Sequence, residues 1–419
     1  MSTVIDPQPT SAAAPGGRLL LSGLLRRDAL DGAGQALGRV IDVIVRLRED
    51  DYPAVTGLVA SIGGRHLFVP ATEIVTWDSR HIELASARLD LRPFERRVGE
   101  VLLHGDVLGH RLVDIEQPRL VTAHDVEFGR TKVGWIAKAV DIAPRGLLHL
   151  RRGHTWRDWS GFEALIGHDG SAPSRLRLGR LHRLKPAQLA DIIEEASDSE
   201  QQELLSRVHA HPELEADVFE ELDEDEAGDL LEARTDAQIA DVLSRMRSED
   251  AADALLDLPQ ERRMPVLGLL PKLVRERITI LLGYQEATAG GLMGVDYLSF
   301  PPTSTVADAI RAISQATRIQ QPEAIMVAFC HDEQRRLVGA VNLVALLQSD
   351  PRATLGAVAD PHPVHVHADA DLPEVTLAMA DYNLIVLPVV DEHDRLIGVL
   401  TCDNVLEAAV ADEWRRRRP

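Results

Sequence analysis

The sequence predicts a multidomain protein in which an all-β region is followed by an all-α superhelix of short helices and then by an α/β region. Three observations predict this fold class. Short apolar runs alternate with polar residues up to about residue 150, a 12-residue helical pattern repeats from residue 211, and an α/β pattern occurs twice near the end, 59 residues apart. At about 100–200 residues per domain, a chain of 419 residues has room for roughly two to four domains.

The composition narrows the class of protein. Hydrophobic residues make up 45% and charged residues 26%, which is typical of a globular protein. The longest fully apolar run near the end, residues 384–390, has seven residues, whereas a membrane-spanning helix needs about 20. We therefore expect no membrane span, and the first residues do not have the pattern of a secretory signal. Two cysteines, Cys330 and Cys402, without CxxC spacing exclude a disulfide framework and favour a cytoplasmic location.

The net charge of −21 is concentrated in one segment. Residues 191–257 hold 23 acidic and 4 basic residues, a net charge of −19, whereas the rest of the chain holds 43 acidic and 41 basic residues. Such a segment repels nucleic-acid phosphates and attracts cations. We therefore expect no nucleic-acid partner. Two interpretations of the segment stay open: a cation-binding surface, or a solvated helical face that keeps the protein soluble.

Residues 18–150 carry the strand patterns, after a Pro/Ala/Gly/Ser-rich stretch, residues 1–17, that predicts a disordered tail. The first copy of the pattern occupies residues 38–47, 55–62 and 65–71. A second, weaker copy occupies residues 110–115, 120–126 and 135–142. In the first copy, a Gly-x-Val-x-Asp strand that contains Asp42 leads to a Gly-Leu-Val strand and then to Phe68-Val-Pro-Ala. This order resembles PRC-barrel modules, which implies tandem docking barrels rather than a catalyst.

Residues 151–183 are basic and irregular and contain Trp156 and Trp159. We expect a linker that packs locally between two domains. A basic segment with tryptophans is also compatible with contact to RNA or to a membrane surface, but a crossing between domains is the more common use of such a segment.

Residues 184–290 predict the acidic superhelix. Consecutive 12-residue units begin at His211, Asp223, Thr235, Arg247 and Pro259. Most units open with turn, capping or acidic residues, which suit a helix N-terminus. Each unit then places mostly apolar residues at its fifth, eighth, ninth and twelfth positions, the spacing of one buried stripe on a helix. Helices this short must stack to bury their stripes, so the units predict a superhelix.

Residues 291–412 predict a doubled α/β unit, followed by a basic tail at 413–419. Asp332 and Gly339 of the first copy recur 59 residues later as Asp391 and Gly398. Each copy reads as a helix, a strand, a turn, a strand and a closing helix. This organisation resembles a pair of CBS motifs, and the second copy, with Val-Leu-Pro-Val-Val-Asp at 386–391, is the closer match.

An acidic superhelix followed by a CBS pair resembles the cytosolic part of MgtE-type magnesium transporters. The most specific segment is the junction, Tyr284-Gln-Glu-Ala-Thr-Ala-Gly-Gly-Leu-Met, in which Ala287 stands where the family usually has an aspartate. The resemblance covers about residues 184–412 and not the five membrane helices that follow in that family. It implies that magnesium ions between the superhelix and the CBS pair lock the two together and that the superhelix swings away without them.

The resemblance also implies a set of magnesium ligands. The two ligand carboxylates of the superhelix fall on Glu249 and Asp253, four residues apart on one helix face. The backbone position at the junction falls on Gly291, and acidic positions of the second CBS motif fall on Asp371 and Glu407. Hard oxygen donors of this kind suit magnesium. The alternative is that Glu249 and Asp253 belong to an ordinary solvated helix face.

Several family positions differ in this chain. Asn383 and Asn404 stand in place of aspartates, and Pro373 stands in place of a glutamate. Because an amide oxygen carries no charge, it binds magnesium more weakly than a carboxylate does. Magnesium sensing is therefore expected to be weaker here, or lost.

CBS pairs often bind adenine nucleotides through a Gly-h-h-Thr/Ser-x-x-Asp signature. The second copy keeps Thr401 but has Asn404 at the aspartate position, and Asp403 lies one position early. The first copy lacks the aspartate as well. We regard Thr401 and Asp403 as weak nucleotide-binding candidates, so that nucleotide binding is less expected than its absence.

The leading functional hypothesis is a cytoplasmic divalent-cation sensor, forming a homodimer through its CBS pair, that controls a separate membrane transporter. The catalytic motifs that we searched for do not occur in the sequence, and we do not expect an enzyme. The alternatives are a scaffold that has kept the fold without the ion response, an adenine-nucleotide-responsive regulator, and one half of a split magnesium transporter.

Overall fold

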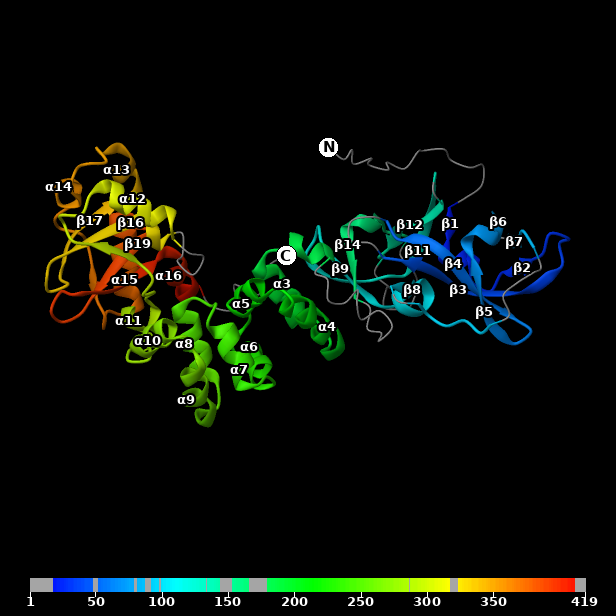
Figure 1. The fold of residues 1–419 in the computed structure, drawn as a ribbon, viewed down its shortest axis with the longest axis horizontal. Helices are drawn as coiled ribbons and strands as arrows, with labels where there is room; N and C mark the ends of the chain where they lie inside the picture. The colour runs from blue at the N-terminus through cyan, green and yellow to red at the C-terminus, as the bar shows by residue number, and fades with distance from the viewer. Residues whose placement is uncertain are drawn as a thin grey trace. The chain divides into compact units, whose positions relative to one another are not determined.

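The computed structural model describes residues 18–47, 52–78, 81–86, 92–97, 99–132, 134–143, 153–165, 179–285, 287–316 and 323–410. The expected tails, 1–17 and 413–419, lie outside these residues. The chain divides into two compact units, Met1–Leu222 and Asp223–Pro419, which are described separately (Figure 1). Within the described residues, no helix is long and apolar enough to cross a membrane.

The first unit is mainly β-structure. Its larger sheet, of 11 strands among the described residues, has the order β1-β11-β12-β4-β3-β2-β7-β6, with β13 beside β12, β5 beside β4 and β8 beside β3. A three-stranded sheet has the order β10-β9-β14. The strands are β1 (Leu19–Leu20), β2 (Asp28–Leu30), β3 (Ala36–Arg46), β4 (Ala54–Ile62), β5 (Arg65–Pro70), β6 (Ile74–Trp77), β7 (Ile82–Leu84), β8 (Glu100–Leu102), β9 (Arg111–Asp114), β10 (Arg119–Thr122), β11 (Asp125–Thr131), β12 (Gly134–Asp141), β13 (Trp156–Asp158) and β14 (Phe162–Ala164).

The two predicted copies of the strand pattern share one sheet and one core. Strand β12 of the second copy pairs with β4 of the first, with Ile136 opposite Ala54. The core they share runs from Leu21 in the short helix α1 (Leu21–Leu24) to Ala164 at the end of β14. The expected all-β region is confirmed, but its strands do not separate into two barrels with a core each within the described residues. The PRC-barrel likeness stays a prediction.

Part of the expected linker belongs to this β-structure. Strand β13 pairs with β12, and β14 pairs with β9, where Phe162 lies opposite Asp114. Trp159, in the single turn between these strands, is 2% exposed. Residues 156–164 are therefore part of the β region in this structure, and only the remainder of 151–183 is left for a linker.

Buried aspartates hold the turns of the β region. Asp42 accepts hydrogen bonds from the backbone N–H groups of Val43 (2.7 Å), His104 (2.7 Å) and Gly105 (2.9 Å), and so ties β3 to the single turn Leu103–Val107. Burial raises the pKa of Asp42, and these backbone donors oppose the increase. The aspartate within the strand of the first PRC-like copy therefore has a structural role.

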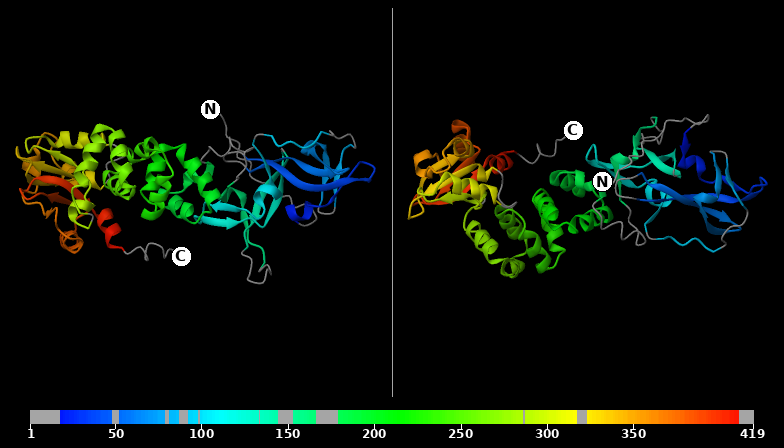
Figure 2. Two further views of the ribbon diagram at one scale, coloured as in Figure 1. Left: turned by 90° about the horizontal axis from the view of Figure 1, so that it is seen from below. Right: turned by 45° about the horizontal axis from the view of Figure 1, so that its top comes forward.

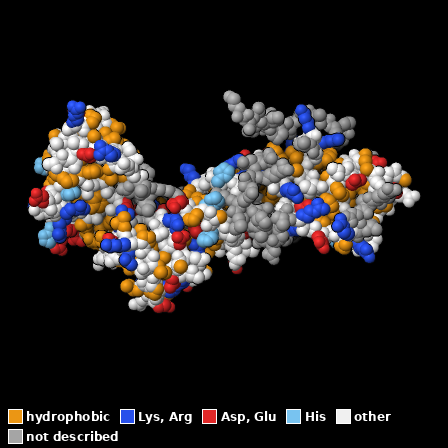
Figure 3. Space-filling model, viewed as in Figure 1, with side chains coloured by type: hydrophobic (Ala, Val, Ile, Leu, Met, Phe, Trp, Pro, Cys, Tyr) orange, Lys and Arg blue, Asp and Glu red, His pale blue; other side chains and the backbone are white. Residues whose placement is uncertain are grey.

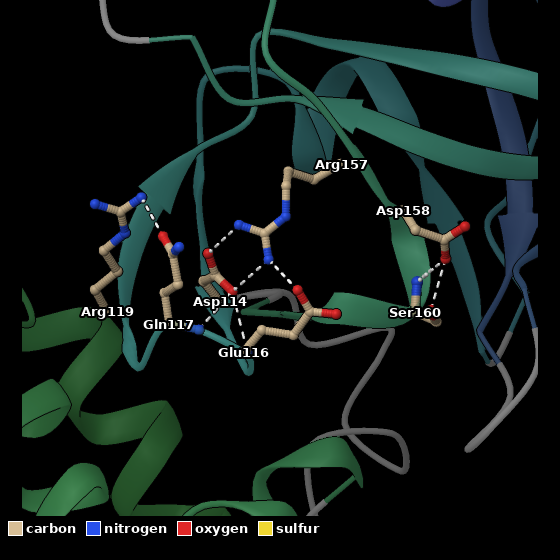
Figure 4. Close-up of polar contacts among 7 residues, drawn as sticks. All are labelled: Asp114, Glu116, Gln117, Arg119, Arg157, Asp158 and Ser160. Carbon is tan, nitrogen blue, oxygen red and sulfur yellow. Dashed lines mark hydrogen bonds and ion pairs between the residues drawn. The ribbon is translucent and has the colours of Figure 1, made fainter.

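Asp114 has the same role at the end of β9. Its carboxylate accepts hydrogen bonds from the backbone N–H groups of Glu116 and Gln117, both at 3.1 Å, and pairs with Arg157 of β13 at 3.1 Å. Figure 4 shows the Arg157 guanidinium between Asp114 and Glu116. Because Asp114 is fully buried, these donors compensate for the desolvation of its charge.

The first unit ends with helices α3 (Pro186–Glu194), α4 (Asp198–His209) and α5 (Pro212–Phe219), preceded by the single turn Gly179–Arg183. Ser197 and Glu200 form a capping box at the start of α4, and Pro186 and Pro212 occupy first positions of their helices, where a missing N–H costs nothing. The apolar stripe of α3 is buried through Leu189, Ile192 and Ile193.

The second unit continues the helical repeat with α6 (Glu224–Glu232), α7 (Asp236–Leu243), α8 (Ser248–Asp257), α9 (Gln260–Leu269) and α10 (Lys272–Leu281). Each of α6 to α10 begins 12 residues after the helix before it, so that α5 to α10 start at 212, 224, 236, 248, 260 and 272. The predicted stripe of the unit at Thr235 is buried as expected, with Ile239, Val242, Leu243 and Met246 at most 3% exposed. Helix α7 packs on α9, and α8 packs on α10. Figure 2 shows these helices in green to yellow-green.

The α/β pair follows the short helix α11 (Ala289–Leu292). Its first half comprises β15 (Leu298–Phe300), α12 (Val306–Ser314), β16 (Val327–His331), β17 (Leu337–Asn342), α13 (Leu343–Gln348) and α14 (Leu355–Val358). Its second half comprises β18 (Val366–His367), α15 (Leu372–Tyr382), β19 (Val386–Val390), β20 (Leu396–Thr401) and α16 (Cys402–Ala409). In each half a strand pairs in parallel with the next, which forms an antiparallel hairpin with the third.

The hairpins confirm the predicted 59-residue repeat. Asp332 pairs with Arg336 at 2.7 Å in the first, and Asp391 pairs with Arg395 at 2.8 Å in the second. Both carboxylates also accept backbone N–H groups of the turn, and these contacts lower the pKa of each aspartate although desolvation opposes them. The two hairpins bond to each other, since Leu337 N–H donates to the Asp394 carbonyl at 2.9 Å.

Substitution of Asp42 tests the role of the buried aspartates. Asp42→Ala leaves three backbone N–H groups without their acceptor, and we expect the free energy of unfolding to fall by at least about 2 kcal/mol. Urea denaturation of the full chain measures this loss. Asp28→Ala is the control, because its ion pair with Arg39 is exposed and is worth less than about 0.5 kcal/mol. Equal losses in the two variants would contradict the assigned role.

Candidate functional site

The candidate site lies where the start of α8 meets the α/β pair within the second unit. Ser248 and Glu249, the first two residues of α8, are 3% and 8% exposed. Buried polar residues are unusual at the start of an acidic helix, because such a terminus is normally solvated. They are buried here because the segment after the junction, residues 293–296, and the start of α16 lie against them.

Ser248 and Asp296 form one half of this contact. The Ser248 hydroxyl donates to Asp296 Oδ2 at 2.8 Å, and the Arg277 guanidinium of α10 pairs with Oδ1 at 2.6 Å. Asp296 is 8% exposed, and burial raises its pKa, whereas Arg277 and Ser248 lower it. The ion pair and the hydroxyl therefore offset the cost of burying this carboxylate and join α8, α10 and the start of the α/β pair.

Glu249 forms the other half. A Cβ added to Gly294 would lie 3.3 Å from Glu249 Oε1, so the carboxylate lies directly against the backbone of the α/β pair. The Asn404 amide of α16 donates a hydrogen bond to it. Burial raises the pKa of Glu249 and the nearby Asp296 carboxylate raises it further, whereas its own backbone N–H, Arg247 and Asn404 lower it. Glu249 is thus a buried acid beside a second acid.

Asn404 is oriented for this contact by the cap of its own helix. Its Oδ1 accepts hydrogen bonds from the Thr401 hydroxyl at 2.5 Å and from the Thr401 backbone N–H at 3.2 Å. Because the oxygen is committed to the cap, the NH₂ group is the part that faces Glu249. An aspartate at this position has no such donor and would place a further negative charge beside Glu249.

The other predicted ligands are exposed side chains, except Gly291, which has only its backbone to offer. Asp253 is exposed one turn after Glu249 on α8, and Glu407 is exposed one turn after Asn404 on α16. Gly291 lies in α11, beside Thr288, which forms a bridge with Asp371. Asp371 is exposed and caps α15 by accepting the backbone N–H of Glu374 at 2.9 Å. The structure therefore brings Asp371 to the junction and Glu249 to the α/β pair.

The contacts of the junction explain why its motif contains glycines. Gly290 N–H donates to the Ala368 carbonyl at 2.8 Å, and Ala289 N–H donates to the Ala370 carbonyl at 2.8 Å. A Cβ on Gly290 would lie 2.5 Å from the Tyr284 ring and 3.1 Å from the Ala368 oxygen. A side chain at this position would therefore separate the junction from the second half of the α/β pair.

The donor set fits a hydrated magnesium ion and does not fit a fully protein-ligated metal. Within the described part of the chain, no three His, Cys, Asp or Glu side chains converge as a metal site. Magnesium keeps several waters and commonly takes only one or two carboxylates from a protein. Glu249 supplies a buried carboxylate whose pKa Arg247 lowers, and the carboxylate of Asp296 is paired with Arg277.

The two nucleotide-binding candidates, Thr401 and Asp403, differ in their exposure. Thr401 is 1% exposed, and its hydroxyl is used in the cap with Asn404. Asp403 is exposed in the first turn of α16. A ribose contact through Thr401 would require the cap to open, and nucleotide binding through these two residues stays a prediction.

Sequence reasoning missed Ser248, Arg277 and Asp296. Asp296 follows the Gly-Gly-Leu-Met motif by three residues in a segment without helical periodicity, so its partners on α8 and α10 are not visible from local spacing. The one available signal was an acidic residue between the apolar Val295 and Tyr297 at the start of the α/β pair.

Substitution of Glu249 tests its burial in the absence of divalent cations. Because the pKa is raised in the folded state, the carboxyl group stabilises the fold fully at a pH below its unfolded pKa and loses that contribution as the pH rises through the raised value. Glu249→Gln, measured by urea denaturation with a chelator, is expected to be more stable than the unmodified protein at about pH 8 and equal to it near pH 4. Exposed Glu224→Gln is the control, and a matching gain there would contradict the prediction.

The comparisons with known proteins agree with this architecture. Residues 184–287 match the MgtE intracellular N domain, and residues 355–411 match the CBS domain. The magnesium transporter MgtE of Thermus thermophilus is 36% identical over 176 residues, which are 42% of this chain and 36% of that protein. MgtE of Bacillus subtilis is 24% identical over 182 residues, 43% of this chain and 40% of that protein. The chain thus spans about two fifths or less of the length of these relatives.

Solved structures extend the likeness to the fold. A crystal structure of the cytosolic domain of the Mg²⁺ channel MgtE in complex with ATP is 30% identical and has a TM-score of 0.51, covering 54% of this chain and 92% of that one. The soluble part of a magnesium transporter is 25% identical and has a TM-score of 0.50, covering 55% of this chain and 90% of that one. The part of the chain after residue 184 therefore consists of an MgtE intracellular N domain followed by a CBS pair, as in the cytosolic domains of MgtE magnesium transporters.

Proposed function

We propose that this chain is a cytoplasmic regulatory protein that senses magnesium at the contact between α8 and the CBS pair and controls magnesium transport through a separate membrane partner. The observation that carries the proposal is the buried carboxylate of Glu249 beside Asp296 and against Gly294. The likeness to MgtE cytosolic domains supports the choice of ion and of process.

Repulsion between carboxylates at the contact of α8 with the CBS pair would be reduced by a magnesium ion. Two carboxylates in one buried contact repel each other, and burial raises the pKa of both although Arg277 pairs with Asp296 and Arg247 lies near Glu249. A divalent cation at the accessible edge of the contact, near the exposed Asp253 and Glu407, reduces this repulsion and favours the closed contact. Because Asn404 already donates to Glu249, the contact also closes partly without an ion, and we expect a weak, millimolar response.

The same architecture favours a homodimer through the CBS pair. Large apolar side chains are exposed on its helices, namely Val344 (61%) and Leu347 (66%) on α13, Leu377 (61%) and Tyr382 (61%) on α15, and Leu406 (60%) on α16. Figure 3 shows hydrophobic side chains at the surface of this part. Exposed apolar clusters on a globular domain commonly mark protein contacts. A second copy of the same surface is the partner that this proposal names.

A second candidate function is a nucleotide-responsive CBS regulator. It is favoured by the MgtE cytosolic domain that was solved with ATP, and it is opposed here by the committed hydroxyl of Thr401. A scaffold that keeps the fold without a ligand is the outcome if neither magnesium nor ATP changes the protein.

Limited proteolysis across a magnesium series tests the sensor. If magnesium binds only the closed contact, millimolar magnesium slows cleavage of residues 184–300, because a ligand of one state stabilises that state. Glu249→Gln together with Asp253→Asn is expected to abolish the protection. Calcium, manganese and matched ionic strength are the ionic controls, and Glu224→Gln, an exposed acid on α6, is the variant control.

Asn404→Asp sharpens this test, because it replaces the donor to Glu249 by a third negative charge. We expect its magnesium-dependent protection to be larger than in the unmodified protein and its magnesium-free contact to be weaker. Cleavage that does not depend on divalent ions in either protein contradicts the sensor and leaves the scaffold. Protection by ATP alone supports the second candidate instead.

The mass of the particle in solution tests the dimer. Leu347→Asp with Leu406→Asp places charges in the exposed apolar surface of the CBS pair, and the protein is expected to become a monomer by light scattering after size exclusion. Met264→Asp on α9, at 72% exposure, is the control and is expected to leave the dimer intact. Loss of the dimer in both variants, or in neither, contradicts the proposed interface.

A further inference from the structure

The β region and the first helices of the MgtE N domain meet in a buried ionic network within the first unit. Arg207 of α4 is 3% exposed. Its guanidinium pairs with Glu163 of β14 at 3.0 Å and with Glu203 of its own helix. It also donates to the Ala164 carbonyl at 2.8 Å. An arginine from the helices is thus buried against a strand of the β region, with two carboxylates around it.

Glu163 extends the network to the segment that precedes the helices. Its carboxylate accepts the backbone N–H of Arg180 at 2.9 Å, and the Arg180 guanidinium donates to the Phe162 carbonyl at 3.1 Å. Gly179 has φ +57°, and a Cβ there would lie 2.5 Å from the Glu163 carboxylate, so a glycine is required at this position. Strand β14, the turn Gly179–Arg183 and helix α4 are therefore joined at one carboxylate.

A second contact fastens the start of α4 to β9. Arg111 pairs with Glu200 through two nitrogens and donates to the Glu195 carbonyl at 3.1 Å. Glu200 also accepts from Ser197 in the capping box of α4. Burial acts to raise the pKa of Glu200, but hydrogen bonds from Arg111 and Ser197 reverse the effect, so that the pKa is lowered. The carboxylate that caps α4 is therefore also the one that binds the β region.

From these contacts we propose that the β region is clamped to helices α3–α5 and moves with them as one body, in place of a docking module on a free linker. Each charge in the network has an opposite neighbour: Arg207 faces Glu163 and Glu203, and Arg111 faces Glu200. Loss of one partner leaves a buried charge uncompensated, which strongly opposes the closed contact. A partner bound at the β region would then act directly on the first helices of the N domain. This inference does not depend on the magnesium proposal.

Cleavage of the covalent connection tests the clamp. A protease recognition sequence is inserted between residues 170 and 171 of the full chain, and the protein is cut and passed over a size-exclusion column. We expect the two fragments to elute together. Arg207→Met is expected to weaken their association on the order of 100-fold or more, so that they separate at micromolar concentration. Separation of the fragments of the unmodified protein would overturn the clamp.

A second variant, Glu163→Gln, separates loss of the clamp from misfolding of α4. Residue 163 lies outside the helices, and glutamine has nearly the same shape as glutamate. The variant removes the ion pair with Arg207 and the charged acceptor of the Arg180 N–H, and is expected to weaken the association of the fragments less than Arg207→Met does, because Glu203 still faces Arg207. Glu276→Gln, which breaks the exposed pair with Lys272, is the matched control and is expected to leave them bound. In the uncut chain, Glu163→Gln is expected to speed amide hydrogen exchange in β9, β14 and α4 together and to leave α9 unchanged. Retained fragments and unchanged exchange in Glu163→Gln would reject the network as the clamp.

Discussion

The helical part of this protein depends on one constraint: a helix of about ten residues with a single apolar stripe is not stable alone and must bury that stripe against its neighbours. A helix inside a stack is covered on both sides, but the helices at the ends need a different cover. In the first unit, the sheet formed by β9, β10 and β14 covers α3 and α4 through Arg111 and Arg207. In the second unit, α8 packs against α6, α9 and α10, and the segment around Asp296 and the start of α16 lie against its N-terminal end.

The two covers differ in how their carboxylates are neutralised. At α4, the buried Arg207 lies between Glu163 and Glu203, so every charge has an opposite neighbour. At α8, the carboxylates of Glu249 and Asp296 lie in one contact, and burial raises the pKa of both. At α8, Arg277 pairs with Asp296 and Arg247 lowers the pKa of Glu249, but burial outweighs these effects, so a further cation nearby would favour the charged carboxylates. The first cover supports the proposed attachment of the β region, and the second supports the proposed response to magnesium.

The sequence predicted the features that repeat locally and missed those that join distant segments. The helix starts from α5 to α9 follow from the 12-residue units, because each stripe is set by residues within one helix. The paired hairpins at Asp332 and Asp391 follow in the same way. The pairing of Ile136 with Ala54 merges the two strand copies into one sheet, and no local pattern encodes it. Asp296 has ordinary neighbours in the sequence and becomes special only through Ser248 and a helix that precedes it.

The asparagine at position 404 reduces the need for a cation at the contact between Glu249 and α16. In the resembling family this position is an aspartate, and an aspartate facing Glu249 is repelled unless a cation lies nearby. Here the amide oxygen is committed to the Thr401 cap, so its NH₂ group must face Glu249 and donate to it. The contact has therefore gained a favourable interaction that requires no ion, while the repulsion between Glu249 and Asp296 remains. Under the proposed function, an ion that acts here strengthens a contact that is already partly formed, so we expect a graded and shallow response to magnesium in place of an all-or-none lock.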